Sequence, residues 1–137
     1  NTFFLIKKPL YNDIQTFDLI NFINENIENN KLIQTDLSIH KKIFILGPII
    51  RILTNQNIYF DNSFPFNLRV FKEWKIRSEK IQQIKSQFKN SNFKLALCNL
   101  TKLNIDYYVS TTFYKDKFIV DNIAFKNDKY ILIKTIC

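Results

Sequence analysis

The sequence of 137 residues predicts an α/β fold: a three-layer, Rossmann-like sandwich with a mainly parallel sheet and a C-terminal antiparallel hairpin. Short apolar runs alternate with amphipathic segments of helical periodicity, which is typical of strands joined by right-handed helical crossovers. Two β-favouring runs then follow each other directly at the carboxyl end. The length and the 46% hydrophobic content suit a single domain over residues 1–137.

The amino-terminal part of the chain is expected to contain a helix and then a strand. The run Thr2–Ile6 is either a strand or the tail of a removed membrane helix. Apolar side chains recur at helical spacing over Ile14–Ile27, and Asp13 stands in a capping position. Lys31–Thr35 then favours a strand, and Asp36 follows it directly.

A short helix and a second strand come next. Pro48 suits the first position of a helix that runs to about Thr54, and apolar residues on most sides of it predict burial. The strand expected at Ile58–Asp61 begins with a short apolar run, Ile58–Phe60, without strict alternation, which indicates a strand covered on both faces. Pro65 then fixes a turn and pushes Phe64 towards an extended conformation.

The second half of the chain contains the longest predicted helix. Helical spacing extends over Asn67–Phe88 and again over Phe93–Leu103. Ile105–Val109 is a third buried-type strand, and the polar run Ser110–Lys117 after it is expected to be a loop. The runs Phe118–Phe125 and Tyr130–Ile136 flank a short polar turn, so they are expected to form the terminal hairpin.

The charge balance is strongly basic, with a net charge of +8 and a pI of about 9.5. Such a charge attracts phosphate, either on nucleic acid or on lipid head groups. Between Arg69 and Lys94 eight basic residues face two acidic ones, which leaves +6. A solvated helix face explains this pattern, and an AT-rich coding sequence explains the abundance of Lys, Asn and Ile, so we expect no nucleic-acid partner.

Cysteine and histidine are too few for a metal cluster. Cys98, Cys137 and His40 do not make the usual four-ligand set, so we expect no metal and no cofactor. Two cysteines also do not form a disulfide framework. Cys98 lies in an apolar run and suits a small buried hydrophobe, whereas a bridge to Cys137 would suit an oxidising compartment; both alternatives stay open.

Five residues are candidate ligand-binding residues: Asp36, Asp61, Glu73, Trp74 and Arg77. The two aspartates follow strands, and in open α/β sheets ligands bind beyond the carboxyl ends of the strands. They would act there as acid and base or hold a cation, unless they only cap loops and helices. Glu73 and Arg77 form an i,i+4 pair worth about 0.3–0.5 kcal/mol, or they face the crevice with Trp74 stacked on a sugar.

Several short motifs together resemble a known class of domain. They are DLINFINEN at 18–26, LIQTD at 32–36, RILT at 51–54, IYFD at 58–61, FPF at 64–66, Glu73-Trp74 with Arg77, and IDYYV at 105–109 with the closing hairpin. This set is similar to the soluble C-terminal domain of bacterial polytopic membrane proteins that resemble membrane-embedded, lipid-linked sugar-using glycosyltransferases. The chain departs from that pattern near Gln56, where relatives carry a basic residue.

The resemblance implies a place on the extracytoplasmic, periplasmic face of a bacterial membrane, attached to the transmembrane part of the same parent chain. A start at Asn1 and the absence of a catalytic motif agree with a processed fragment of that kind. The implied function is a non-catalytic accessory domain that supports the membrane part or positions a glycan or lipid-linked substrate, with an anionic membrane surface or a glycan as partner.

Two other classes of function remain as alternatives. A nucleic-acid-binding module would use the basic helix 67–88 to neutralise phosphates. A small enzyme would place its site in the crevice at the strand ends, with Asp36 and Asp61. No motif in the chain names a reaction, so whether the protein is an enzyme stays undecided.

Overall fold

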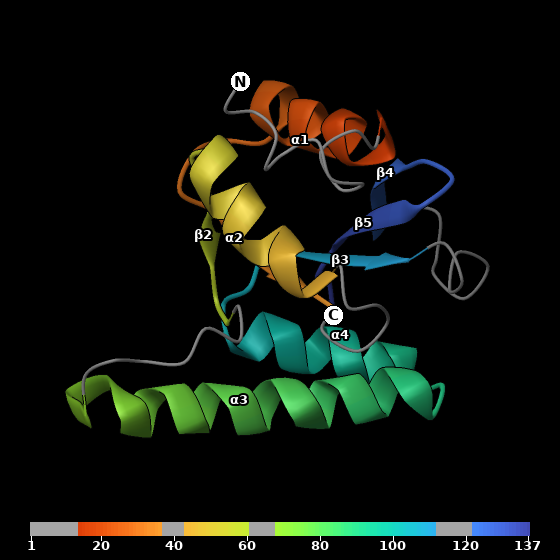
Figure 1. The fold of residues 1–137 in the computed structure, drawn as a ribbon. Helices are drawn as coiled ribbons and strands as arrows, with labels where there is room; N and C mark the ends of the chain where they lie inside the picture. Colours follow the sequence, from red (N-terminus) through yellow and green to blue (C-terminus); the bar gives the residue numbers. More distant parts are fainter. Residues whose placement is uncertain (1–13, 37–42, 61–67, 112–121) are drawn as a thin grey trace.

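The computed structural model describes residues 14–36, 43–60, 68–111 and 122–137 and shows a mixed α/β fold (Figure 1). The elements are α1 (Ile14–Asn26), β1 (Leu32–Thr35), α2 (Ile43–Leu53), β2 (Asn57–Ile58), α3 (Leu68–Lys89), α4 (Phe93–Lys102), β3 (Tyr107–Thr111), β4 (Ile123–Lys126) and β5 (Tyr130–Lys134). The run Thr2–Ile6 lies outside the described residues.

The five strands form one sheet in the order β2-β1-β3-β5-β4. The pairs β1–β2 and β1–β3 are parallel, as predicted, with Ile33 opposite both Ile58 and Tyr107. The pairs β3–β5 and β5–β4 are antiparallel, so the predicted terminal hairpin is confirmed. The sheet is therefore parallel at the β2 end and antiparallel at the β4 end.

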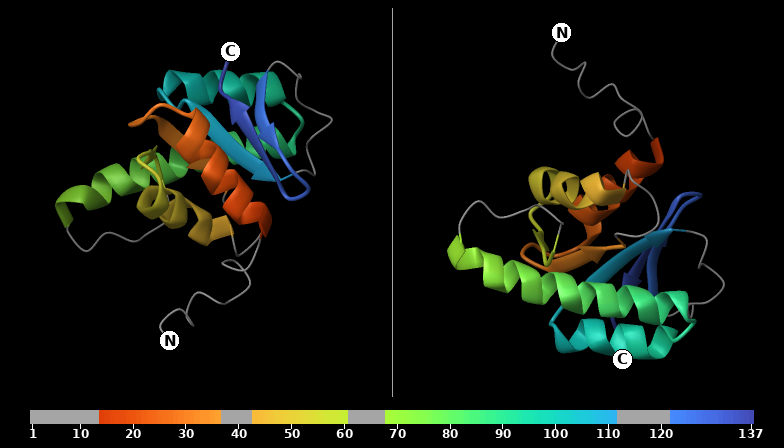
Figure 2. Two further views of the ribbon diagram at one scale, coloured as in Figure 1. Left: turned by 90° about the horizontal axis from the view of Figure 1, so that it is seen from above. Right: turned by 60° about the horizontal axis from the view of Figure 1, so that its bottom comes forward.

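Two hydrophobic clusters lie on opposite faces of the sheet. The first contains side chains of α1 and α2 with Ile33, Val109 and Leu132 of the sheet. The second contains side chains of α3 and α4 with Tyr108 and Ile133. Figures 1 and 2 show the same arrangement, with α1 and α2 on one side of the sheet and α3 and α4 on the other. Because successive strand residues point to opposite faces, the same strands supply both clusters.

The helical periodicity of the sequence predicted α1, α3 and α4 correctly. In α1 the side chains of Leu19, Ile20 and Ile23 are buried, which is the spacing of one helix face. At the amino end of α1 the Thr16 hydroxyl and the Tyr130 hydroxyl are 3.0 Å apart in a buried hydrogen bond. This contact ties α1 to β5, at the other end of the sequence.

The prediction that a helix starts at Pro48 was wrong. The helix α2 runs through this proline, from Ile43 to Leu53. Proline inside a helix removes one backbone hydrogen bond and costs about 3 kcal/mol. Leu46 and Ile50, one turn apart around Pro48, are both fully buried, and burying two such side chains contributes about as much. The predicted burial of this helix holds for Leu46 and Ile50 but not for Ile52, which is 76% exposed.

The second strand is shorter than predicted and lies at the sheet edge. Only Asn57 and Ile58 are in β2, although Phe60 is buried beyond it. The side-chain amide of Gln34 accepts from the Phe60 N–H at 3.0 Å and donates to the Phe60 carbonyl oxygen at 2.9 Å. A side chain of β1 therefore replaces backbone pairing at this point.

The third strand begins and ends two residues later than predicted. It covers Tyr107–Thr111, and Ser110, which was expected in a loop, is 1% exposed. The residue before it, Asp106, holds its place by donating its own N–H to the Leu32 carbonyl oxygen at 2.7 Å. After β4, the Asn127 side chain accepts from the N–H groups of Lys129 and Tyr130, which closes the hairpin turn.

We predict that Gln34→Leu destabilises the fold by about 2–4 kcal/mol. The Phe60 N–H and carbonyl would both lose a buried partner, and each such loss costs about 1–3 kcal/mol. The measurement is the free energy of unfolding in urea. The matched control is Gln82→Leu at an exposed position of α3, which should change the stability by less than about 0.5 kcal/mol. Equal stability of the two variants would refute this role of Gln34.

Candidate functional site

The carboxyl ends of β1 and β3 meet at one edge of the sheet, as the sequence predicted. Asp36 follows β1, is 3% exposed, and donates its N–H to the Val109 carbonyl oxygen at 2.9 Å. The other aspartate of the predicted crevice, Asp61, lies outside the described residues, and so does His40. A role of Asp36 and Asp61 as a pair therefore stays a prediction.

One polar atom at this strand end has no hydrogen-bond partner among the residues that the structure describes. The Thr35 hydroxyl is fully buried, and among the described residues it is the only buried side-chain polar atom without a partner. The neighbouring Gln34 amide also donates to the Thr35 carbonyl oxygen at 2.9 Å. An unpaired buried hydroxyl costs free energy, so the Thr35 side chain destabilises this part of the sheet locally.

The three candidates on α3 lie together and contact the end of β2. The Arg77 guanidinium donates to the Glu73 carboxylate and to the Tyr59 carbonyl oxygen, each at 2.9 Å. Its central carbon also lies 4.6 Å from the centre of the Tyr59 ring, a cation–π distance. The predicted Glu73–Arg77 pair is thus confirmed, and Arg77 additionally clamps α3 to the residue after β2.

Trp74 completes this cluster. Its ring centre lies 5.6 Å from that of Phe60 and 6.0 Å from that of Phe71, with the Phe71 ring nearly parallel. Trp74 is half-buried in this aromatic group, which packs on the α3–α4 side of the sheet. Sugar stacking by Trp74 stays a prediction.

The ionisation of Tyr59 responds to the same contacts. Burial raises the pKa of the Tyr59 phenol, while the nearby Arg77 charge lowers it and Glu73 raises it. The folded state therefore holds the neutral phenol to a higher pH than the unfolded state does. The resulting stabilisation is present at neutral pH and is lost as the pH rises above the ordinary tyrosine value.

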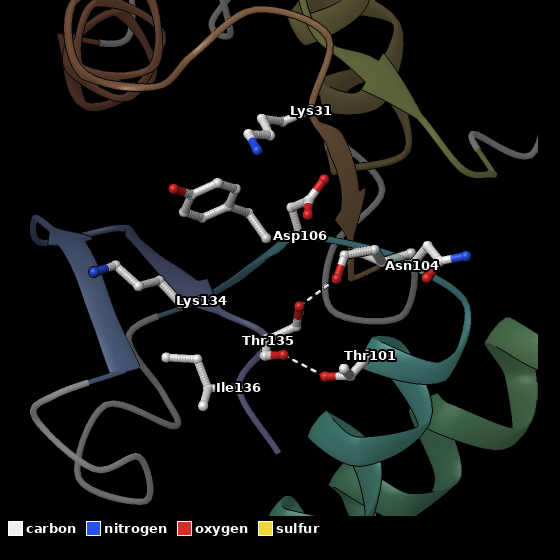
Figure 3. Close-up of a pocket in the computed structure, with 9 residues that line it drawn as sticks. Lys31, Thr101, Asn104, Asp106, Lys134, Thr135 and Ile136 are labelled. Carbon is white, nitrogen blue, oxygen red and sulfur yellow. Dashed lines mark hydrogen bonds between the residues drawn. The ribbon is translucent and has the colours of Figure 1, made fainter.

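A pocket of about 350 Å³ opens at the opposite end of the parallel strands (Figure 3). It is lined by Lys31, Thr101, Asn104, Ile105, Asp106, Tyr107, Lys134, Thr135 and Ile136. The Asp106 carboxylate accepts from the Leu32 N–H at 2.9 Å, which fixes its position between β1 and β3. The sequence analysis did not identify this pocket, because its charged residues precede two strands and end a third.

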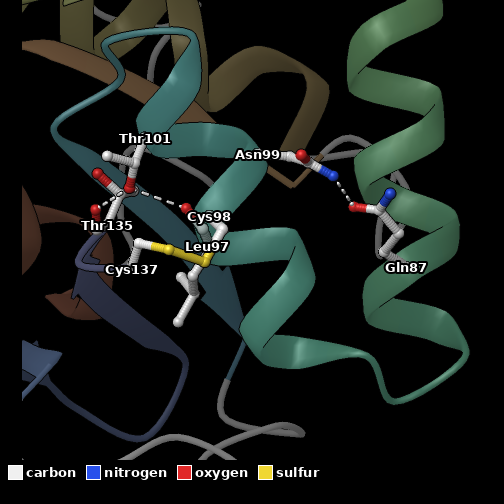
Figure 4. Close-up of a disulfide and its surroundings, with 7 residues drawn as sticks. All are labelled: Gln87, Leu97, Cys98, Asn99, Thr101, Thr135 and Cys137. Atoms are coloured by element: carbon white, nitrogen blue, oxygen red, sulfur yellow. Dashed lines mark hydrogen bonds between the residues drawn. A yellow bond between two sulfur atoms is a disulfide. The ribbon is translucent and has the colours of Figure 1, made fainter.

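A disulfide between Cys98 of α4 and Cys137 lies next to this pocket (Figure 4). The alternative of an unpaired buried Cys98 is therefore wrong, since Cys98 is only half-buried. Two hydroxyls reinforce the same contact: Thr101 donates to the Thr135 carbonyl oxygen, and Thr135 donates to the Ile105 carbonyl oxygen. The last residues of the chain are thus fixed against α4, and they form one wall of the pocket.

The described residues contain no group of three or more His, Cys, Asp or Glu side chains that could hold a metal ion. Within the same ranges no helix is both long enough and apolar enough to cross a bilayer. Comparisons with protein-family models, with curated proteins and with solved structures give no match for this chain.

We predict that Arg77→Met lowers the free energy of unfolding by about 1–3 kcal/mol. The change removes a charge-assisted hydrogen bond to a backbone carbonyl and the contact with the Tyr59 ring. Arg77→Lys should recover only part of the loss, because an ammonium does not reproduce the fork of the guanidinium. The control is Lys80→Met at an exposed position of the same helix. If Arg77→Met unfolds at the same urea concentration as this control, the clamp contributes nothing.

We predict that replacing Cys98 and Cys137 together by Ser lowers the stability by about 2–4 kcal/mol. The bridge joins residues 39 positions apart, and loop-closure entropy for that length gives up to about 4 kcal/mol. Denaturant unfolding with and without dithiothreitol measures the effect. Reductant should lower the unfolding midpoint of the native protein to that of the double variant. It should leave the unfolding midpoint of the variant unchanged. An unchanged midpoint of the native protein would show that the bridge does not stabilise the fold.

Proposed function

We propose that this chain is a non-catalytic accessory domain on the extracytoplasmic face of a bacterial membrane protein. In this role it supports the transmembrane part of its parent chain or positions a glycan or a lipid-linked substrate. The observation that carries the proposal is the disulfide between Cys98 and Cys137. Disulfides persist in oxidising compartments such as the periplasm and are rare in the reducing cytosol.

The position of the bridge supports a structural role for it. Cys98 lies in α4 between Leu97 and Leu100, which are 6% and 0% exposed in the α3–α4 cluster. Cys137 follows the Thr135 hydroxyl that bonds into the same region. These contacts hold the last residues beside α4, so that Cys98 and Cys137 stay within bonding distance of each other. The packing therefore favours the oxidised form of the two cysteines.

The contacts of the motif residues favour an accessory role over a catalytic one. Tyr59, Phe60, Glu73, Trp74 and Arg77, which carry part of the resemblance, contact one another in one cluster. Packing and a helix-to-strand clamp are sufficient reasons for these residue types at this spacing. This agrees with the resemblance, which implies no chemistry within such a domain.

We further propose that the fold is a Rossmann-like, three-layer sandwich. Helices cover both faces of a sheet whose first three strands are parallel, in the spatial order β2-β1-β3. The helix between β1 and β2 and the helices between β2 and β3 pack on opposite faces. Such a change of face supports a doubly wound arrangement, in which a topological switch point would lie between β1 and β3.

The basic surface suits a position near phosphate-bearing lipid. Lys72, Lys75 and Lys80 of α3 are exposed to solvent. At 100° per residue these three lysines span 140° of the helix surface, so they form a broad basic region and not one narrow stripe. A broad region suits a diffuse anionic surface, such as lipid head groups, better than the grooves of a nucleic acid.

The redox state of the two cysteines in the producing cells tests the compartment. Intact cells are treated with a thiol-blocking reagent, and the protein is then isolated and relabelled with a heavy maleimide with and without prior reduction. We expect a mass shift only after reduction, and sedimentation of the protein with the membrane fraction. The reading frame that encodes the chain should also contain a multi-span hydrophobic region upstream.

Two results would contradict the proposal. Cysteines that react with the blocking reagent before reduction would indicate a reducing compartment. A protein that stays in the supernatant after lysis, with no membrane-spanning region in its reading frame, would exclude the membrane parent.

A further inference from the structure

The pocket beside β3 places two lysines on either side of a tyrosine. In the sheet register Tyr107 of β3 lies opposite Lys134 of β5 and also opposite Ile33 of β1. Lys31 precedes Ile33 by two residues and so stands on the same face. Neighbouring strands are about 4.8 Å apart, and Lys31 lies two residues, about 6.6 Å, along the strand from Ile33, so the two lysine stems leave the sheet about 12 Å apart with the Tyr107 strand between them.

The charges of both lysines remain available to a ligand. The Lys31 ammonium is 3.9 Å from the Glu28 carboxylate, but the Glu28 side chain is 86% exposed, so this ion pair is weak. Within the described part of the chain no ion pair or side-chain hydrogen bond engages the Lys134 ammonium. Two such cations at the mouth of one pocket attract a group with more than one negative charge, such as a phosphate.

The wall of the pocket offers groups that suit sugar hydroxyls. One oxygen of the Asp106 carboxylate is held by the Leu32 N–H, and among the described residues its second oxygen has no hydrogen-bond partner. Figure 3 shows Asp106 between Lys31 and the Thr101–Thr135 pair, whereas the side-chain amide of Asn104 points away from Asp106. A carboxylate accepts hydrogen bonds from hydroxyl groups, and the half-buried Tyr107 offers an aromatic ring against which a sugar packs.

The wall itself is rigid. The Thr101 and Thr135 hydroxyls donate to backbone carbonyls, and the disulfide joins the following turn of chain to α4. A wall that does not rearrange lowers the entropy cost of binding a small ligand. The volume of about 350 Å³ is at the lower end of ligand pockets, which fits one monosaccharide with its phosphate.

We infer that this pocket binds a sugar phosphate, with Lys31 and Lys134 on the phosphate and Asp106 and Tyr107 on the sugar. The inference rests on the proposed function for one point only, that the sugar phosphate is the head group of a lipid-linked substrate. The pocket chemistry itself is the same for a free sugar phosphate.

Titration of the full chain with glucose 1-phosphate, followed by isothermal calorimetry and by amide chemical shifts, tests the pocket. Glucose alone and inorganic phosphate are the comparison probes, and both should bind at least about tenfold more weakly, since each offers one half of the contacts. The shifts should concentrate at residues 104–107 and 134–136. Equal binding of inorganic phosphate and glucose 1-phosphate would overturn the inference, as would no binding.

The variant pair Lys31→Gln with Lys134→Gln should weaken glucose 1-phosphate binding about tenfold or more. Lys89→Gln, at an exposed position at the end of α3, is the control and should bind like the native protein. The melting temperature of each variant is measured first. If the Lys31/Lys134 variant melts like the native protein and still binds equally well, the lysines are not the phosphate ligands.

Flotation with vesicles separates the two sources of ligand. Vesicles with a polyprenyl-phosphate sugar are compared with vesicles that carry the same charge as phosphatidylglycerol. Preferential flotation with the first, lost in the Lys31/Lys134 variant, supports the lipid-linked head group. Binding of free glucose 1-phosphate without such preference supports the pocket and contradicts only its lipid source, whereas the thiol-labelling experiment tests the compartment independently.

Discussion

The parallel pairing of β1 with β3 is the interaction on which the rest of this structure depends. It joins Ile33–Thr35 to Tyr107–Val109, segments that are more than 70 residues apart in the sequence. Ile33 and Val109 are fully buried on the α1–α2 side, while Tyr108 is buried on the α3–α4 side. Because both faces of this strand pair are covered, each helix layer packs against it, and β2 and β5 are then added on either side.

Three side-chain contacts strengthen the fold where backbone pairing stops. Gln34 bonds to Phe60 after β2, Arg77 clamps α3 to Tyr59, and the bridge from Cys98 fixes the end of the chain. Each of these contacts joins a helix or a strand to a segment that lies outside the hydrogen-bonded strand pairs. The candidate sites are adjacent to these contacts, because the same polar groups that secure the strand ends also line the spaces beside them.

The sequence predicted the helices and the parallel core well and the strand limits poorly. Leu19, Ile20 and Ile23 share one helix face, which periodicity detects directly. The start of α2 was predicted wrongly because burial in the tertiary structure outweighed the local cost of Pro48 inside a helix. Ser110 was predicted to lie in a loop because it is polar, although it is buried.

The candidate site was predictable only where its residues are close in the sequence. The Glu73–Arg77 pair follows from i,i+4 spacing, whereas the pocket at Lys31, Asp106 and Lys134 depends on the register of three strands. The short second strand also has a consequence for self-association. An edge with only two residues in regular pairing is a poor template for a strand from another molecule. This side of the sheet is thereby protected from edge-to-edge polymerisation.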